Sequence, residues 1–506
     1  MTQKRFENFI NGNFISFRGK RFFSKNPADR RKVLGSFPQS DRKTVNAACE
    51  AARTAYPLWS RTPWPVRADY LKKFGQEVER NEKGLARIVA QESGKALAEA
   101  RADVVEARHM LEYAASFGRN AIGNIIPSEV PKKFAFTLRV PIGPTASISP
   151  WNFPIAIPTW TWAIALVAGN TVVFKPSEDT PLCGQKLAEI ASRVKFPKGV
   201  FNLVHGNAQT GKALVRHRAI KNIVFTGSFG AATWIQTESI RLGKLCATEA
   251  GGKAGIVITK SANMDIAVDA ALKGAYKTTG QRCVSASRFI VDEEIADEFT
   301  ARFVAETKRT IRVGNPLSPE TTMGPMINEN GLKKVERFNA MVRRAAKIER
   351  SGITILLDGA RARKGMLRHG NFLTPFIYRV DKYNSRFLPT QEEVFGPHIA
   401  IIPYRSGQWR QAFKIHNDTP YGLAGAIVSN DFEEVFDFIT LTSEIGVRYA
   451  NLSSVGAEVQ LPFGGLKRSG NNKPSGAGIL PHVTHTIAAT INFGKEVVLP
   501  QSLGKK

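Results

Sequence analysis

The chain has 506 residues, 43% of them hydrophobic, and its 71 Lys and Arg exceed its 43 Asp and Glu to give a formal net charge of +28. This length and apolar content suffice for about three domain-sized units, or for two large ones with an insertion, and they exclude collagen-like, coiled-coil, solenoid and low-complexity chains. The basic residues form short, widely separated clusters without interleaved aromatic residues, which disfavours nucleic acid as a partner. The positive electrostatic field of the protein would still favour the binding of anionic small molecules.

The first part of the chain is helical in pattern. Residues 1–8 contain no apolar stretch of the kind that a secretory signal needs. Apolar residues then recur at spacings of three and four over residues 42–60, 68–81 and 82–115, which predicts helices.

After residue 121 the pattern becomes extended. Two runs, residues 124–127 and 134–140, are divided by Pro131-Lys132-Lys133 and predict a hairpin with no neighbouring partner. Near the other end of the chain, residues 485–493 alternate like an edge strand. We expect the hairpin and this tail strand to form a small sheet between subunits.

Strands and helices alternate after the hairpin. The pattern predicts them in turn at residues 146–149, 160–168, 170–175, 182–194, 200–204, 211–216, 222–226 and 231–242. Units of this length are typical of a parallel, doubly wound sheet. The longest apolar stretch, residues 155–173, is interrupted at Pro158 and Gly169-Asn170, so we expect a buried helix followed by a strand and no membrane association. A second alternating block begins at residues 254–258 and runs to about Tyr449.

Three polar groups in this region have the chemistry of covalent catalysis. A helix-like run over residues 266–276 leads to the sequence Gly280-Gln-Arg-Cys283, which can present a thiol to a substrate. Upstream, Glu249 stands on a predicted glycine turn, and Asn152 lies between two prolines. Thiol, carboxylate and amide are the nucleophile, base and oxyanion donor that acyl chemistry needs.

The four cysteines do not suggest a disulfide framework, because no pair has CxxC or zinc-like spacing. A reducing compartment, the cytoplasm, is therefore expected. Taken alone, Cys283 is equally consistent with a buried structural thiol. We interpret Cys49, Cys183 and Cys246 as small core or surface residues.

Two segments that follow predicted strands carry the side chains of a nucleotide site. Lys175 and Glu178 come just after a strand end, where open α/β sheets bind ligands, and a carboxylate can accept two hydrogen bonds from a ribose. Gly227-Ser228 ends another strand and begins a helix whose free amides could bind a pyrophosphate. The alternatives are a surface loop and an ordinary helix N-cap, and the sequence has no GxGxxG fingerprint.

Two other segments remain ambiguous by themselves. Residues 206–212 match GxxxxGK, but Ala213 replaces the Ser or Thr that would bind Mg²⁺, which favours a glycine-rich turn over a triphosphatase. Glu393 and Phe395 could hold a second ribose and pack on a planar ring. The alternative for them is an acidic loop with a core phenylalanine.

Seven motifs follow one another along the chain: PWNFP (150–154), GNTVVFKPSE (169–178), FTGS (225–228), EAGGK (249–253), GQRC (280–283), EEVFGP (392–397) and PFGG (462–465). Together they resemble the NAD(P)-dependent aldehyde dehydrogenase superfamily over nearly the whole chain. The GQRC context and residues 470–475 are similar to semialdehyde dehydrogenases that act on succinylglutamate semialdehyde. Residues 139–173 are more similar to those that act on α-ketoglutarate semialdehyde.

The resemblance implies an α/β fold of the aldehyde dehydrogenase type, with two doubly wound parallel-sheet domains and a small bridging element of hairpin and tail strand. It also implies a homodimer or homotetramer joined through that element. The expected limits are residues 1–121 and 141–250 for the cofactor-binding domain, with 453–482 packing back on it, 251–452 for the catalytic domain, and 122–140 and 483–498 for the oligomerisation element.

By position, the resemblance implies that Cys283 is the nucleophile, that Asn152 and the Cys283 amide hold the oxyanion, and that Glu249 activates the deacylating water. Contacts with NAD are implied for Ile148, Trp151, Lys175, Ser177, Glu178, Gly211, Gly227, Ser228, Glu393 and Phe395. No metal is implied. The thiolate would add to the aldehyde, hydride would pass to the nicotinamide, and water would cleave the thioester.

The expected substrate is a carboxylate-bearing semialdehyde, because Arg282, Ser285 and Ser454 could bind a carboxylate near the thiol. Alternatively, Arg282 points away and the enzyme oxidises assorted aldehydes. We expect NAD rather than NADP because Glu178 would repel a 2′-phosphate, although Lys175 could soften that preference. Two other classes remain: a thiol esterase that uses Cys283 and Glu249, and a basic nucleic-acid-binding protein on the same fold.

Overall fold

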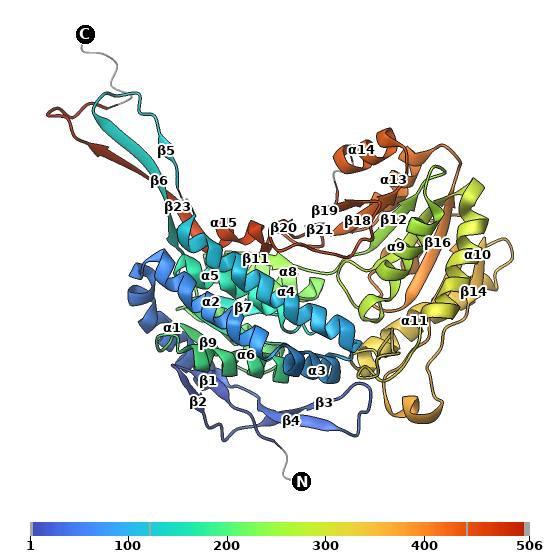
Figure 1. Cartoon of the computed structure of the whole chain (residues 1–506), viewed down its shortest axis with the longest axis horizontal. Helices are drawn as coiled ribbons and strands as arrows, with labels where there is room; N and C mark the ends of the chain where they lie inside the picture. Colours follow the sequence, from blue (N-terminus) through green and yellow to red (C-terminus); the bar gives the residue numbers. More distant parts are fainter. Residues whose placement is uncertain (1–3, 121–122, 442–443, 500–506) are drawn as a thin grey trace.

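The computed structural model describes residues 4–120, 123–441 and 444–499. They form two lobes and a projecting arm (Figure 1). One lobe contains most elements up to β11 (Leu245–Glu249), and the other contains those from β12 (Ala254–Ile258) to β19 (Val447–Ala450). The architecture is the α/β class with two sheets that the sequence predicts.

The first lobe is built on a seven-stranded sheet with the order β11-β10-β7-β8-β9-β1-β2. Its parallel strands are β7 (Thr145–Ile148), β8 (Val172–Lys175), β9 (Phe201–Leu203), β10 (Asn222–Thr226) and β11. The predicted parallel sheet is therefore confirmed. The antiparallel edge strands β1 (Asn8–Ile10) and β2 (Asn13–Ile15) were not predicted, because three residues are too few to show a period.

Helices cover this sheet, and the most buried of them is α5 (Ala156–Ala168), which packs against α4 (Leu97–Ser116). The apolar stretch over residues 155–173 thus forms a buried helix followed by a strand, as predicted. The predicted helical run over residues 82–115 is divided into α3 (Glu82–Ser93) and α4, because Gly94 ends α3 in a left-handed conformation (φ 81°). The remaining helices are α1 (Arg42–Arg61), α2 (Trp64–Arg80), α6 (Pro181–Val194), α7 (Ala208–Arg216) and α8 (Phe229–Arg241). Of the helices in the described ranges, none is both long and apolar enough to cross a bilayer.

The second lobe has a seven-stranded sheet with the order β14-β15-β16-β13-β12-β18-β19, parallel except for β14. It confirms the second alternating block. Its other strands are β13 (Ala286–Asp292), β14 (Ile353–Leu357), β15 (Phe376–Val380), β16 (His398–Tyr404) and β18 (Ala424–Val428), and its helices are α9 (Met264–Tyr276), α10 (Glu293–Thr310), α11 (Glu329–Ala346), α12 (Leu388–Gln391), α13 (Trp409–Asn417) and α14 (Phe432–Leu441).

The arm is a three-stranded antiparallel sheet that extends away from the two lobes (Figure 1). Strand β6 (Lys133–Pro141) pairs with the short β5 (Ile125–Ile126) on one side and with β23 (Thr484–Asn492) on the other. The hairpin and the tail strand therefore join in one sheet, as expected. Large apolar side chains on it, such as Ile125 and Ile491, are 74% and 54% exposed.

The segment over residues 453–482 contacts both lobes. On the first lobe α15 (Leu480–Val483) packs on α5 and Gly470 forms a bridge with Glu249, and on the second lobe Leu466–Lys467 pairs with Tyr421–Gly422. The domain limits remain a prediction, and the limit between residues 121 and 122 lies outside the described residues. The minor elements are β3 (Arg21–Lys25), β4 (Val33–Pro38), η1 (Phe117–Arg119), η2 (Lys277–Gly280), η3 (Gly365–His369), β17 (Tyr421–Gly422), β20 (Pro462–Phe463), β21 (Leu466–Lys467), β22 (Ser475–Gly476) and η4 (Ala477–Ile479).

Candidate active site

A cavity of about 830 Å³ lies at the carboxyl ends of the parallel strands in the first sheet and is closed on its other side by the second lobe. Ile148, Lys175 and Glu249 are the last residues of β7, β8 and β11, which bring them to one edge of the sheet. All thirteen predicted catalytic and cofactor residues line this cavity: Ile148, Trp151, Asn152, Lys175, Ser177, Glu178, Gly211, Gly227, Ser228, Glu249, Cys283, Glu393 and Phe395.

Cys283 is half-buried and faces this cavity. It follows η2, where Thr278, Thr279 and Gly280 are all left-handed (φ 55°, 60° and 69°). This turn reverses the chain between α9 and β13. Burial and the carboxylates of Glu249 and Glu393 raise the pKa of the Cys283 thiol well above its ordinary value.

Glu249 ends strand β11 and is 1% exposed. The sequence predicts Glu249 on a glycine turn, but in the structure it is the last residue of the strand. The glycine-rich segment begins after it, and the backbone amide of Ala250 donates to the Ser469 carbonyl at 2.8 Å. Burial raises the pKa of Glu249 to about 8, and the nearby Glu393 carboxylate contributes to the rise. A carboxyl group of this pKa can take up a proton near neutral pH.

Asn152 is 4% exposed, and its Nδ2 donates to the Gln281 carbonyl oxygen at 3.2 Å. An amide nitrogen has two hydrogens, so one remains for a ligand. The Asn152 Oδ1 atom is buried and has no partner in the part of the chain that the structure describes. Three other buried atoms of the cavity wall also have no hydrogen-bond partner among the described residues: Ser149 Oγ, Thr226 Oγ1 and Glu249 Oε1. Such a group of unsatisfied atoms indicates that the cavity is built for a polar ligand.

The far end of the cavity has donors and acceptors that fit a dinucleotide. Ser228 precedes α8, and its side chain makes no capping hydrogen bond, so the hydroxyl and the first amides of the helix are available to a pyrophosphate. Lys175 Nζ lies 3.6 Å from Glu178 Oε2, and the Glu178 side chain is 45% exposed toward the site. Burial lowers the pKa of Lys175.

Glu393 and Phe395 line the part of the cavity beside Trp151. Glu393 Oε1 accepts a hydrogen bond from the Gly252 amide at 2.9 Å, and a Cβ on Gly251 would lie 2.1 Å from the same oxygen. The glycine therefore allows the carboxylate its close approach. Phe395 is left-handed (φ 62°), and its ring meets that of Trp151 edge-on at 5.5 Å. Strained backbone at a non-glycine residue is typical of functional sites.

The three predicted substrate residues do not line the cavity. Arg282 Nη2 is paired with Glu99 Oε2 at 3.1 Å, and its side chain is 15% exposed. Ser285 Oγ accepts from the Arg282 amide, and Ser454 Oγ donates to the Val284 carbonyl at 2.7 Å. Each of these side chains is engaged in bonds that support the loop around Cys283, and their contact with a substrate stays a prediction.

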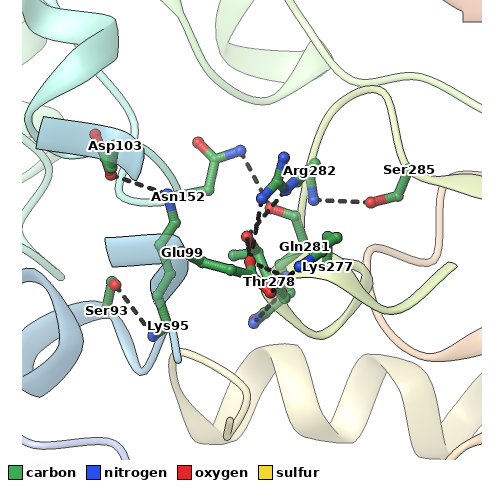
Figure 2. Close-up of polar contacts among 10 residues, drawn as sticks. All are labelled: Ser93, Lys95, Glu99, Asp103, Asn152, Lys277, Thr278, Gln281, Arg282 and Ser285. Carbon is green, nitrogen blue, oxygen red and sulfur yellow. Dashed lines mark hydrogen bonds and ion pairs between the residues drawn. The ribbon is translucent and has the colours of Figure 1, made fainter. Parts of the chain in front are cut away.

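Sequence reasoning missed the residues that support the site from behind. Gln281 joins Asn152 to the Cys283 loop, and its place beside Cys283 was the only available indication. Glu99 and Asp103 of α4, and Lys95 just before that helix, reach the same loop and the segment after Asn152 (Figure 2). In the sequence they are ordinary charged residues of a helix.

Comparison with known proteins agrees with this geometry. Residues 14–488 match the sequence profile described as "Aldehyde dehydrogenase family". An α-ketoglutaric semialdehyde dehydrogenase of Bacillus subtilis (strain 168) is 33% identical over 472 residues, 93% of this chain and 94% of that protein. A 2,5-dioxopentanoate dehydrogenase of Saccharolobus solfataricus is 32% identical over 462 residues, 90% of this chain and 93% of that protein. Among solved structures, betaine aldehyde dehydrogenase of Staphylococcus aureus in complex with NAD⁺ superposes with a TM-score of 0.91 at 28% identity, covering 97% of this chain and 95% of that one.

Proposed function

The chain belongs to the aldehyde dehydrogenase family, and from that premise we propose that it oxidises a carboxylate-bearing semialdehyde to the acid with NAD. The coarser activity, NAD(P)-dependent oxidation of an aldehyde, is that of the family. The observation that carries the proposal is that a thiol, a carboxyl group and an amide donor, Cys283, Glu249 and Asn152, line one cavity.

In the proposed mechanism the ionised Glu249 carboxylate takes the proton of the Cys283 thiol, and the sulfur attacks the aldehyde carbon to form a thiohemiacetal. The free Nδ2 hydrogen of Asn152 and the Cys283 amide stabilise its oxyanion, and one such donor is typically worth about 3 kcal/mol. NAD, when bound, would supply the acceptor for the hydride that leaves the former aldehyde carbon. The product on the enzyme is a thioester of Cys283.

Glu249 completes the proposed reaction as the base for hydrolysis. Its ionised carboxylate takes a proton from a water molecule, and the resulting hydroxide adds to the thioester carbonyl. The acid leaves and the Cys283 thiolate is regenerated. Because burial raises the pKa of Glu249 to about 8, the same group can release the proton to solvent near neutral pH.

For the cofactor, we propose that Lys175 and Glu178 hold the adenosine ribose, that Ser228 and the first amides of α8 hold the pyrophosphate, and that Glu393 holds the second ribose, with Phe395 packing on the planar ring. The remaining cofactor residues, Ile148, Trp151, Ser177, Gly211 and Gly227, would line the same groove. The exposed carboxylate of Glu178 favours NAD, since a 2′-phosphate would be repelled there.

A carboxylate on the substrate is supported by the two semialdehyde relatives, since α-ketoglutarate semialdehyde and 2,5-dioxopentanoate are the same compound. The net charge of +28 would also steer an anion toward the protein. A broad-specificity enzyme is the second candidate, and the internal pairing of Arg282 with Glu99 favours it.

We also propose a homodimer or homotetramer assembled through the arm, because its exposed apolar side chains would be covered by a partner. A cytoplasmic location is proposed on the ground that unpaired thiols, Cys283 among them, persist in a reducing compartment.

The test is steady-state turnover with NAD and a panel of aldehydes, with formation of the reduced cofactor followed by absorbance. The panel pairs 2,5-dioxopentanoate and succinate semialdehyde with uncharged aldehydes of equal length. A kcat/KM at least 10-fold higher for the carboxylated member of each pair supports the proposal. Equal values favour the broad-specificity enzyme, and turnover that survives Cys283→Ala contradicts the mechanism.

A further inference from the structure

A group of charged side chains on the first half of α4 lies directly behind the turn that leads to Cys283 (Figure 2). Glu99 and Asp103 are buried, 6% and 0% exposed. Both belong to a helix that does not line the cavity. Buried carboxylates are costly unless they are fully engaged, so their bonds indicate what they do.

Glu99 binds the turn before Cys283 at several points. Its Oε2 atom accepts hydrogen bonds from the Thr278 amide at 2.6 Å and from the Thr278 hydroxyl at 2.8 Å. The same oxygen accepts from Arg282 Nη2 at 3.1 Å, and Arg282 Nε donates to the Thr278 hydroxyl at 3.0 Å. One carboxylate therefore joins the two ends of the five-residue segment from Thr278 to Arg282.

This segment has an unfavourable backbone that requires such support. Thr278 and Thr279 are β-branched, yet both are left-handed, with φ,ψ of 55°,33° and 60°,32°. Branched side chains rarely adopt this conformation, and it persists only when surrounding contacts hold it. The bond to the Thr278 amide fixes the first of these residues, and the bond from the Thr279 hydroxyl to the Gly324 carbonyl fixes the second.

The segment in turn positions Asn152. The Gln281 carbonyl accepts the hydrogen bond from Asn152 Nδ2, and the Gln281 side chain is held by the Thr278 carbonyl and the Ile327 amide. If Thr278 moves, the carbonyl that directs Asn152 moves with it. Glu99 is thus linked to the proposed oxyanion donor through a continuous series of hydrogen bonds.

The same helix also holds the segment after Asn152. Asp103 accepts from the Ala156 amide at 2.7 Å and pairs with Lys95 at 2.9 Å, both side chains being completely buried. Lys95 Nζ and the Arg282 guanidinium lie 3.2 and 5.0 Å from the centre of the Phe153 ring. Residues of α4 therefore hold both the segment that follows Asn152 and the loop that carries Cys283.

We propose that Glu99 is a positioning residue for the oxyanion site: its carboxylate holds the left-handed turn at Thr278, and through Gln281 it fixes the direction of the Asn152 amide. This inference rests on the proposed function, in which Cys283 is the nucleophile and Asn152 stabilises the oxyanion. It also assigns Arg282 to the support of the loop instead of to the substrate.

The experiment is a double-mutant cycle between Glu99→Gln and Asn152→Ala, measured with propionaldehyde and NAD. Propionaldehyde has no charged tail, so the outcome does not depend on the substrate class. Removing an oxyanion donor costs about 10²–10³ in kcat, and misdirecting it should cost less, so we expect Glu99→Gln to lower kcat about 10-fold. The KM for NAD should stay within about twofold, and the double variant should be no slower than Asn152→Ala alone.

Glu112→Gln is the matched control, because Glu112 lies on the same helix and its side chain is 60% exposed. Additive losses in the cycle, or a kcat for Glu99→Gln equal to that of Glu112→Gln, would overturn the inference. Should Glu99→Gln not fold, Thr278→Val removes the hydroxyl between Glu99 and Arg282 and must show the same non-additivity with Asn152→Ala. Turnover retained by Cys283→Ala would instead refute the proposed function, so the two failures are distinguishable.

Discussion

The proposed role of Glu249 predicts a specific dependence of deacylation on pH. Burial raises the pKa of Glu249 to about 8, and a general base acts only when ionised. At pH 7, one unit below that value, about a tenth of the carboxyl groups are ionised, so the rate should be about a tenth of its plateau. It should rise about 10-fold for each unit below pH 8 and level off above it.

The assay is a single-turnover measurement with p-nitrophenyl acetate, which acylates a reactive thiol without any cofactor. After excess ester is removed, the loss of the acetyl group from Cys283 is followed by mass spectrometry between pH 5.5 and 9.5. In Glu249→Gln we expect a rate that is about 10²–10⁴-fold lower at the plateau and independent of pH over the range in which the native enzyme changes. If Glu249→Gln shows the same rise with pH as the native enzyme, another group is the base and the reasoning is refuted.

A second consequence concerns stability and does not involve catalysis. The pKa of Glu249 is raised from 4.5 to about 8 in the folded state. The contribution of this group to the free energy of unfolding is therefore fully present below pH 4.5 and is lost as the pH rises toward 8. The loss amounts to about 5 kcal/mol at 1.36 kcal/mol per pKa unit. Since glutamine stays neutral, Glu249→Gln should have a higher Tm than the native protein at pH 9, and the difference should shrink as the pH is lowered toward 5. A constant difference would show that the buried carboxyl does not ionise in this range.

Three other predictions follow from particular contacts. Glu178→Gln should lower the ratio of kcat/KM for NAD over NADP by about 10-fold, about 1.4 kcal/mol, because the charge that faces a 2′-phosphate is removed; an unchanged ratio would place the ribose elsewhere. Gly251→Ala should raise the KM for NAD at least 10-fold, because the new Cβ would displace Glu393, and titration of NAD by fluorescence checks it. Ile491→Asp should dissociate the oligomer in light scattering whereas its neighbour Thr490→Asp on the other face of β23 should not; a native protein that is already monomeric would contradict the assembly.

The fold could be predicted where strands are long enough to show their pattern. The repeated units from residue 146 onward were recognised because short apolar runs alternate with amphipathic helices. Strand β11 was missed because Leu245 and Cys246 at its start are not buried, and its extended form depends on pairing with β10. The break between α3 and α4 was missed because a single glycine, Gly94, is tolerated in a helical pattern and only its left-handed conformation ends the helix.

In the candidate site, too, residues placed by nearby sequence could be predicted, whereas contacts between distant parts of the chain could not. Ile148, Lys175 and Glu249 are brought together by the sheet itself, because they end parallel strands of one sheet. The full set of thirteen residues that lines the cavity was implied by the family resemblance. The position of Arg282 next to Cys283 in the sequence was not enough to predict its contacts, because its side chain pairs with Glu99, which lies 183 positions away. The contact joins a helix of the first lobe to a loop of the second. Interactions of this kind leave no periodicity or motif in the sequence. The sequence therefore suggested that Arg282 binds the carboxylate of a substrate, whereas in the structure Arg282 is paired with the carboxylate of Glu99.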